Sequence, residues 1–361
     1  SEGQSLLQEA AAAYPKNTVI QTYLGETQPW PYELSTGNDA PAWAIAQRKV
    51  LHHLEEIIRF WVEERQAIDG QMGGGWGDDV EMWRKWTPIL LAFDHPSSKE
   101  AQEKLAAGIF ALPRLENGYT HIMTDVEHSS EDSGDPLLAM LLLNPTSEDW
   151  KNKANTIGDL MQNIWTAENE LGFLQFKSTY FTSTETSDNS SFACDTAYHV
   201  RAIQPALLLW QRGQAQHFDT LFQGWLQTWA HSVNHDASGK PIGVLPSAIH
   251  FPSGLPGGPN TQWWNPGCHI TNKTFQYPRA LSFMSQALML AYLQTENDIY
   301  LDPFYKMVEV WRQTRLEPTE SASGNTQWAA DKMTKYLPTA LSKLRLITGQ
   351  THFDDFINVE G

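Results

Sequence analysis

Residues 125–143 contain a sharp polar-to-apolar boundary, with the sequence DVEHSSEDSGD followed directly by PLLAMLLL. Pro136 suits the first turn of a helix, where its missing N–H costs nothing, and Ser133 or Asp135 can cap that helix. The apolar tail has no polar face, so we predict a buried helix over residues 137–143. Because acidic groups beside a buried helix need partners or water held in a cleft, residues 125–135 either cap this helix or line a cleft at its end.

Further helices are predicted on both sides of this stretch from apolar residues at three- and four-residue spacing and from capping signals. They span residues 4–14, 42–66, 78–93, 97–112, 147–166, 195–211, 215–232, 279–295, 299–315 and 326–348. Nearly all-apolar helices alternate with amphipathic ones, as inner and outer rings of helices require. We therefore predict an all-α fold of the (α/α)6 toroid type, as one domain over residues 1–361.

Two segments depart from the helical pattern. Residues 172–184 alternate and are rich in Thr and aromatic residues, which predicts a strand or a β-hairpin. Residues 236–278 are rich in Gly and Pro and predict a long loop insertion, a kind of segment that usually carries function. We expect strand only in these two segments, and a loosely held tail after residue 348.

Composition limits the partners of this chain. The formal net charge of −17 argues against nucleic-acid binding, because no basic stripe is present to meet the phosphates. No apolar run reaches the length needed to cross a bilayer, so no membrane partner is expected. The first residues lack the features of a signal peptide, so we expect a processed or trimmed form of a secreted or periplasmic bacterial protein. The two cysteines, Cys194 and Cys268, leave a disulfide and free thiols equally open.

A polar head precedes each of four apolar helices. The four heads are residues 73–81, 125–135, 194–201 and 269–279. In a toroid these heads would meet at one pole, so we predict that they line one cleft. The residues expected around this cavity are Trp76, Asp79, His128, His199 and His269.

No metal ion or cofactor is expected from the sequence. His121, Asp125 and His128 do not match the spacing of a strong zinc signature. Asp125, Glu127 and Glu131 offer oxygen ligands for Ca²⁺, but no EF-hand pattern is present. A structural Ca²⁺ or Zn²⁺ near Asp125, Glu127 and His128 is kept as the alternative.

A helical toroid with Trp, Asp, His, Tyr and Arg at the ends of its inner helices resembles the (α/α)-toroid enzymes of polysaccharide breakdown. These enzymes include toroid polysaccharide lyases and six-hairpin glycosidases. The likeness covers most of the chain at the level of architecture, and no catalytic role is carried over from it. It implies a polysaccharide or oligosaccharide substrate.

Our first functional hypothesis is a lyase that cleaves a uronate-containing polysaccharide by β-elimination. We assign Tyr180 as the acid/base, with help from His128 or His199, and Arg201 or Arg279 as the group that holds the uronate carboxylate. Tyr198 and Tyr277 are the next candidates for the acid/base. The expected substrate-binding residues are Trp76, Asp78, Asp79, Glu127, Glu131, Trp263, Trp264, Asn265, His269, Tyr277 and Arg279.

Two alternatives remain open. A six-hairpin glycoside hydrolase would need a pair of carboxyl groups, for which Asp78, Asp79, Glu127 and Glu131 are candidates. A non-catalytic glycan-binding protein would use its tryptophans to stack on sugars. We expect Trp263 or Trp264 to form a sugar platform at the cleft rim, because two adjacent tryptophans in a Gly/Pro-rich loop are hard to bury together.

Overall fold

The computed structural model describes residues 2–26, 39–93, 95–116, 118–260, 262–269, 274–279 and 281–361. Helix makes up 60% of the structure and strand 7%, so the mostly helical fold expected from the sequence is confirmed. The described residues divide into two compact units, Ser1–Ile57 and Ile58–Gly361. The single domain and the closed toroid stay predictions.

The first unit contains α1 (Glu2–Ala13), α2 (Thr18–Tyr23) and the first part of α3 (Ala42–Glu64). Asn17 begins α2, because its side-chain oxygen accepts hydrogen bonds from the backbone N–H groups of Val19 at 3.0 Å and Ile20 at 3.2 Å. Helix α1 lies within the expected range 4–14 apart from its first two residues, whereas α2 was not expected.

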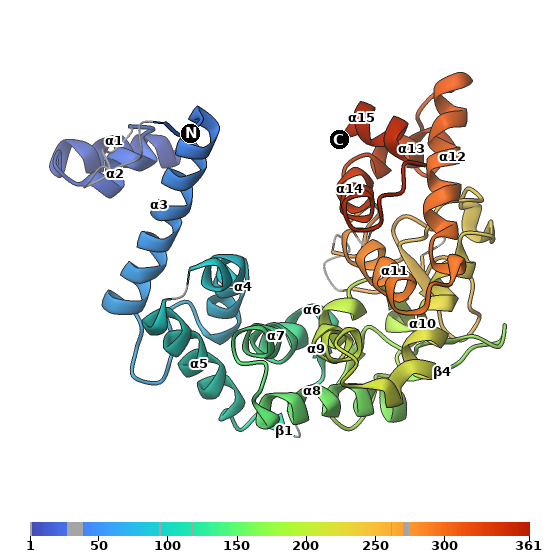
Figure 1. The fold of residues 1–361 in the computed structure, drawn as a ribbon, viewed down its shortest axis with the longest axis horizontal. Helices are drawn as coiled ribbons and strands as arrows, with labels where there is room; N and C mark the ends of the chain where they lie inside the picture. Colours follow the sequence, from blue (N-terminus) through green and yellow to red (C-terminus); the bar gives the residue numbers. More distant parts are fainter. Residues whose placement is uncertain are drawn as a thin grey trace. The chain divides into compact units, whose positions relative to one another are not determined.

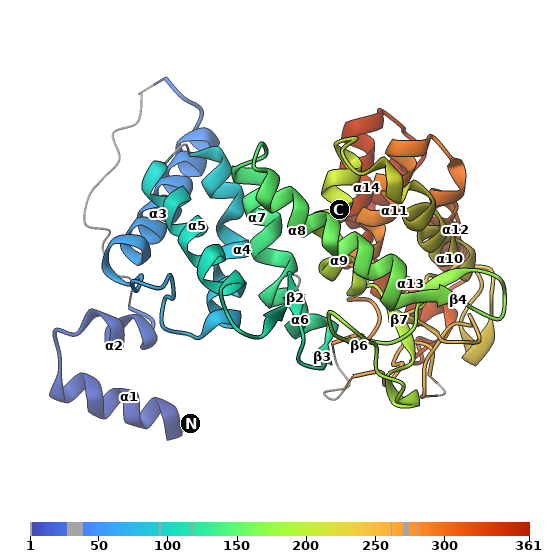
Figure 2. The ribbon, with the colours of Figure 1, turned by 90° about the horizontal axis from the view of Figure 1, so that it is seen from below.

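The second unit is a succession of helices, which Figures 1 and 2 show from two sides. They are α4 (Trp76–Ala92), α5 (Pro96–Phe110), α6 (Val126–Asp132), α7 (Gly134–Leu143), α8 (Glu148–Leu160), α9 (His199–Gln211), α10 (Asp219–Ser232), α11 (Leu281–Thr295), α12 (Asp302–Leu316), α13 (Thr326–Met333), α14 (Leu337–Thr348) and α15 (Asp354–Glu360). A π-helical turn (Met161–Trp165) extends α8.

Short strands pair with one another between the helices and loops of the second unit. They are β1 (Leu115–Glu116), β2 (Tyr119–Thr120), β3 (Thr124–Asp125), β4 (Thr166–Glu168), β5 (Leu174–Phe176), β6 (Tyr180–Phe181), β7 (Cys194–Thr196) and β8 (Ala248–His250). They pair antiparallel as β1–β2, β3–β6, β4–β5 and β7–β8. The register of β3–β6 places Asp125 opposite Tyr180.

The apolar helix α7 lies at the centre of the second unit. It packs against α4 and α5 on one side and against α8 and α9 on the other. Leu137, Met140 and Leu141 belong to the larger hydrophobic core, whereas Leu143 packs against the smaller core formed by α3, α4 and α5. Contacts of α4 with α7, α7 with α9, α9 with α11 and α11 with α14 form one row of neighbouring helices. The buried helix predicted over residues 137–143 is therefore present.

A glycine brings α7 and α9 close together. A Cβ atom at Gly134 would lie 2.7 Å from the backbone oxygen of Arg201, so a larger residue would force the two helices apart. This close approach sets the first turn of α7, with Asp135, against the first turn of α9, with Arg201. Two of the predicted polar heads therefore meet.

Several sequence-based expectations need correction. Residues 126–132 of the polar head form a helix of their own, α6, which Asp125 caps, and residues 194–196 form strand β7, so α9 begins at His199. The helix predicted over 326–348 is two helices, α13 and α14, separated by a turn. The tail forms α15 with Phe356 fully buried. Strands β1–β4 and β7 lie outside the segments predicted to contain strand, because pairs of two or three residues leave no detectable alternation.

Cys194 and Cys268 form a disulfide, with both side chains buried. It joins strand β7 to the insertion across 74 residues of sequence. Cys268 is also held by Thr179, whose hydroxyl donates to the Cys268 backbone oxygen at 2.6 Å. The disulfide and this hydrogen bond fix the position of the neighbouring His269. No helix in the described ranges combines the length and the apolar content needed to cross a bilayer.

Replacement of both cysteines by serine is expected to lower the free energy of unfolding by about 2–4 kcal/mol, because the bond restricts a long loop of the unfolded chain. Urea denaturation of the double variant measures the effect. Wild-type protein that is unfolded and refolded under reducing conditions is the control and should match it. An unchanged midpoint in the double variant would show that the bond adds no stability.

Candidate functional site

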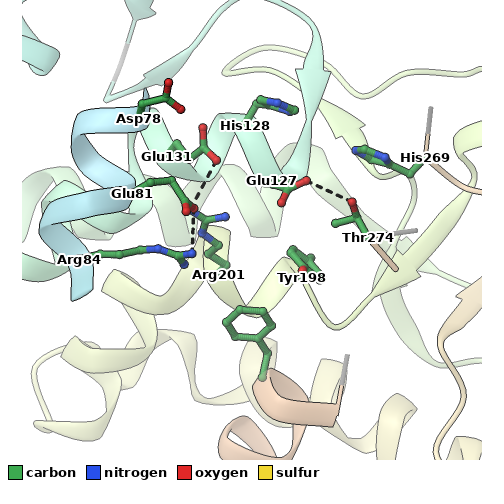
Figure 3. A pocket seen from close by; sticks show the side chains of 11 residues that line it. Asp78, Glu81, Arg84, Glu127, His128, Glu131, Tyr198, Arg201, His269 and Thr274 are labelled. Atoms are coloured by element: carbon green, nitrogen blue, oxygen red, sulfur yellow. Dashed lines mark hydrogen bonds and ion pairs between the residues drawn. The ribbon is translucent and has the colours of Figure 1, made fainter. Parts of the chain in front are cut away.

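One polar cavity of about 430 Å³ opens within the second unit. Figure 3 shows the side chains around it, with α4 on one side and His269 and Thr274 on the other. Its lining residues are Asp78, Glu81, Arg84, Glu127, His128, Glu131, Tyr198, Arg201, His269, Thr274 and Phe283. They come from α4, α6, α9 with the residue that precedes it, α11 and the insertion. All four predicted polar heads therefore contribute to one cavity.

The first turn of α4 supplies Asp78 and Glu81. Its neighbour Asp79 is buried and accepts hydrogen bonds from the backbone N–H groups of Met72 at 2.7 Å and Gly74 at 3.0 Å. Asp79 therefore holds the glycine-rich loop before α4. This loop orients the helix so that the exposed Asp78 lines the cavity.

Helix α6 contributes Glu127, His128 and Glu131 to the cavity wall from one short segment. Asp125 begins the helix, accepting from the backbone N–H groups of Glu127 at 2.9 Å and His128 at 3.2 Å. Glu127 and Glu131 are four residues apart and so share one face of the helix. Buried Val126, which donates its N–H to the Thr179 backbone oxygen at 2.8 Å, fixes the opposite face.

The guanidinium group of Arg201 is paired with carboxylates. It donates to Asp135 at 2.6 and 3.0 Å and to Glu81 at 2.6 Å, and it lies 3.8 Å from Glu131. Arg84 likewise pairs with Glu81 at 2.8 Å. The two guanidinium groups of the cavity wall are therefore already neutralised, which argues against Arg201 as the group that holds a uronate carboxylate.

Glu131 is the lining carboxyl group with the most perturbed environment. Burial raises its pKa to about 7, and the nearby Glu81 adds to the rise, against the opposing effects of Arg201 and His128. The carboxyl group lies against the start of α4, since a Cβ atom at Gly77 would lie 2.9 Å from Glu131 Oε2. Glu131 is thus a carboxylic acid that stays protonated up to near-neutral pH beside Asp78 of the opposing helix.

Two histidines flank Asp125 at the other side of the cavity. His128 Nδ1 lies 2.7 Å from Asp125 Oδ2, and His269 Nε2 lies 3.3 Å from Asp125 Oδ1. Burial alone would raise the pKa of Asp125, but the hydrogen bonds from His269 and His128 lower it to about 2. Burial also lowers the pKa of His128, yet the hydrogen bond and charge of Asp125 outweigh it and the net pKa is raised. Asp125, Glu127, His128 and His269 could together hold a metal ion.

Tyr180 and His199 do not line the cavity. Tyr180 is 7% exposed and stacks on Phe192, with its ring 6.5 Å from that of His269. His199 is fully buried, and its ring bonds Asp195 and the Ser178 backbone oxygen and stacks on Phe176. The expectation that His199 faces the cavity is wrong, because its imidazole completes a hydrogen-bond network inside the core.

The tryptophan pair of the insertion is also internal. Trp263 is fully buried and donates to the Gly324 backbone oxygen at 2.9 Å, and half-buried Trp264 packs on Trp263 and Trp328. Tyr277 packs on Trp263 and donates to the Ala329 backbone oxygen at 3.0 Å. The expected sugar platform at the cleft rim is therefore wrong for Trp263. Aromatic contacts with α13 bury these side chains, although the Gly/Pro-rich composition of the loop predicted that they would be exposed.

The remaining predicted residues lie around the cavity rather than in its wall. Half-buried Trp76 packs on Gly108 of α5, and Asn265 lies in a smaller hollow beside His269. Arg279 is exposed. Burial raises the pKa of Tyr198 overall, although the charge of Arg279 lowers that pKa.

Four lining residues are absent from the sequence-based site. They are Glu81, Arg84, Thr274 and Phe283. Glu81 and Arg84 follow Asp78 at helical spacing of three residues, so the face of α4 could have identified them. Thr274 and Phe283 have no comparable signal in the sequence.

Comparisons of this chain with family models, with curated proteins and with solved structures gave no significant match.

Proposed function

We propose that this protein is a carbohydrate-active enzyme of the glycoside hydrolase type, with Glu131 and Asp78 as its two carboxyl groups. The observation that carries this proposal is that a half-buried carboxyl group on α6 lies against the first turn of α4, and that an exposed carboxyl group from that turn lines the same cavity. Hydrolysis of a glycosidic bond needs one carboxylic acid and one carboxylate on either side of the bond. Pairs of carboxyl groups in different environments take these two roles.

Each residue then has a separate task. Glu131, which keeps its proton up to near-neutral pH, donates it to the leaving oxygen of the glycosidic bond. Asp78 is the carboxylate on the other side of the sugar, where it either attacks the anomeric carbon itself, before water releases the sugar, or takes a proton from the water that attacks this carbon. Glu81 is not available for this task because Arg201 and Arg84 engage it, which lowers its pKa despite burial.

Aromatic side chains support a sugar substrate. Tyr198 and Phe283 both line the cavity, and their rings lie 5.2 Å apart. Aromatic faces can stack on the apolar face of a sugar ring, while the surrounding carboxyl groups accept hydrogen bonds from hydroxyls. The row of helices from α4 to α14 supports an inner ring as in (α/α)-toroid enzymes, although the closed toroid itself is part of the proposal.

A polysaccharide lyase is the second candidate, and one observation favours it. Tyr198 lines the same cavity as His128 and His269, so a phenol and two imidazoles could move protons there. Tyr198 would take the acid/base role that the sequence assigned to Tyr180. The pairing of Arg84 and Arg201 with carboxylates leaves this cavity less suited to a uronate, which places the lyase second.

A panel of neutral and uronate-containing polysaccharides tests both candidates in one experiment. New reducing ends without ultraviolet absorbance from an unsaturated product would support the hydrolase. Reducing ends with that absorbance would support the lyase. If neither signal appears while binding is detected, the protein is a glycan-binding protein rather than an enzyme.

The pH dependence provides a further prediction. A general acid works only while protonated, so kcat is expected to fall as pH rises through about 7, the pKa of Glu131. Because this pKa lies above the ordinary value of 4.5, the folded state binds more protons between about 4.5 and 7, and the free energy of unfolding should fall as pH rises across this window. Urea denaturation at about pH 4.5 and about pH 7 measures this loss in the free energy of unfolding. In Glu131→Gln, the part of the loss that comes from Glu131 should be absent. A kcat that keeps rising above neutral pH would contradict the role of Glu131.

The cell compartment is part of the same proposal. A buried structural disulfide is typical of proteins that fold in an oxidising environment. A secreted or periplasmic enzyme fits this feature and would meet polysaccharides there.

A further inference from the structure

We propose that Asp125, Glu127, His128 and His269 form a binding site for one divalent transition-metal ion, with Zn²⁺ as the best match. This inference does not depend on the proposed reaction. It adds a ligand that neither the hydrolase nor the lyase candidate requires.

The geometry of the four side chains fits a single ion. One donor atom from each residue lies within 4.8 Å of the donor atoms of the other three. The carboxylate of Asp125 lies between the two histidines, with Oδ2 at 2.7 Å from His128 Nδ1 and Oδ1 at 3.3 Å from His269 Nε2. Zinc bonds of about 2.0–2.2 Å in a tetrahedron hold neighbouring ligand atoms a little over 3 Å apart. Small side-chain rotations therefore suffice to seat the ion.

The protein holds these ligands from two distant parts of the sequence. Backbone N–H groups at the start of α6 orient the carboxylate of Asp125, and strand pairing fixes Asp125 opposite Tyr180. His269 follows Cys268 directly, so the disulfide and the hydrogen bond from Thr179 anchor it. The hydroxyl of Thr274 donates to Glu127 at 3.4 Å. Such outer contacts position metal ligands and sustain metal affinity.

The donor chemistry selects the kind of ion. Two imidazole nitrogens and two carboxylates suit Zn²⁺ and its first-row neighbours, whereas Ca²⁺ and Mg²⁺ prefer oxygen ligands alone. The two carboxylates balance the double charge of the ion. The cavity wall is also acidic, with four carboxyl and two guanidinium groups among its lining residues.

The ion would face the cavity. Glu127, His128 and His269 line it, whereas Asp125 is buried behind them. A bound ion would therefore touch water or a substrate oxygen on its open side. By contrast, the second His/Glu group of the described residues, His52 with Glu55 and Glu56, comes from a single turn of α3 and lacks ligands from a second segment.

The test is Zn²⁺ binding by the full chain, measured by competition with a chromophoric chelator and by metal content after dialysis. We expect one Zn²⁺ per chain, and an affinity at least about tenfold lower in His128→Ala, His269→Ala and Glu127→Gln. The matched control is His121→Ala, which removes an exposed histidine near the site but outside the group. It should bind Zn²⁺ like the wild type.

Several results would overturn the assignment. They are a wild-type chain that binds no Zn²⁺, equal binding by wild type and both His269→Ala and Glu127→Gln, and a loss in His121→Ala as large as that in His128→Ala. Displacement of Zn²⁺ by equimolar Ca²⁺ would also overturn it. Because His269 is buried, its variant could fail to fold, so Glu127→Gln with an unchanged circular dichroism spectrum provides the independent readout. Co²⁺ in place of Zn²⁺ should give visible absorption bands that the same variants lose.

Discussion

Glu131→Gln is expected to lower kcat by about 10²- to 10⁴-fold, because the amide keeps the size of the side chain but is too weak an acid to transfer a proton. The substrate is the polysaccharide that gives the highest rate in the panel described above. KM should change much less than kcat, since the loss falls on the transition state and not on ground-state binding. Initial rates of reducing-end release over a range of substrate concentrations separate the two constants.

The matched control is Glu148→Gln, which makes the same chemical change at an exposed position paired only with Lys151. It should retain wild-type kcat. If Glu131→Gln keeps more than about a tenth of the wild-type rate, the loss is under about 1.4 kcal/mol and Glu131 is not the general acid. In that case Tyr198→Phe becomes the decisive variant, because a dead Tyr198→Phe beside an active Glu131→Gln identifies the lyase.

Arg201→Met is expected to lower the free energy of unfolding by about 3–5 kcal/mol, because it leaves the buried carboxylate of Asp135 without its charge partner. Asp135 and Arg201 are both buried, with Asp135 4% exposed and Arg201 2% exposed. The same arginine joins α9 to α7 and, through Glu81, to α4. Urea denaturation followed by circular dichroism measures the loss.

Two comparisons make this prediction specific. Arg312→Met removes a half-buried arginine paired with the solvent-exposed carboxylate of Asp355 and should cost no more than about 1 kcal/mol. The double variant Arg201→Met with Asp135→Asn should recover part of the loss, because no unpaired buried charge remains. Equal losses in Arg201→Met and Arg312→Met would show that the buried network adds little to stability.

The helices of the second unit could be predicted because their signals are local. Apolar spacing, proline positions and capping residues act within one or two turns, so the approximate ranges of α4, α5, α8, α10 and α12 follow from the sequence. The acidic head at 125–135 could also be recognised from the sequence. Five carboxyl groups directly before an all-apolar helix need polar partners or water, so they must lie at the surface or in a cleft. His128, which was predicted at the cavity, does line it, and so do Glu127, Glu131 and Asp78, whose predicted role in substrate binding stays a prediction.

The side-chain direction of the other candidates could not be predicted. Trp263 lies in a Gly/Pro-rich loop, yet it packs against Trp328 of α13, 65 positions further along the chain. His199 is the first residue of α9, a position that predicted a cleft residue. Its ring nevertheless faces Asp195 and Phe176 inside the core. Asp195 is only four positions from His199, but Phe176 and Trp328 come from other segments, and no local pattern of the sequence shows which segments lie close in space.

The sequence by itself determined the helical class, the buried helix α7 and the polar residues that stand at helix ends, because each depends on interactions among neighbours in the chain. Only the tertiary structure decided that Arg201 is neutralised by Asp135 and Glu81, and that His269 reaches Asp125 across 144 positions with the help of a disulfide. These outcomes depend on which helix ends meet. The packing of all helices together and the close contact at Gly134 fix which helix ends meet, so no single segment of the sequence predicts it.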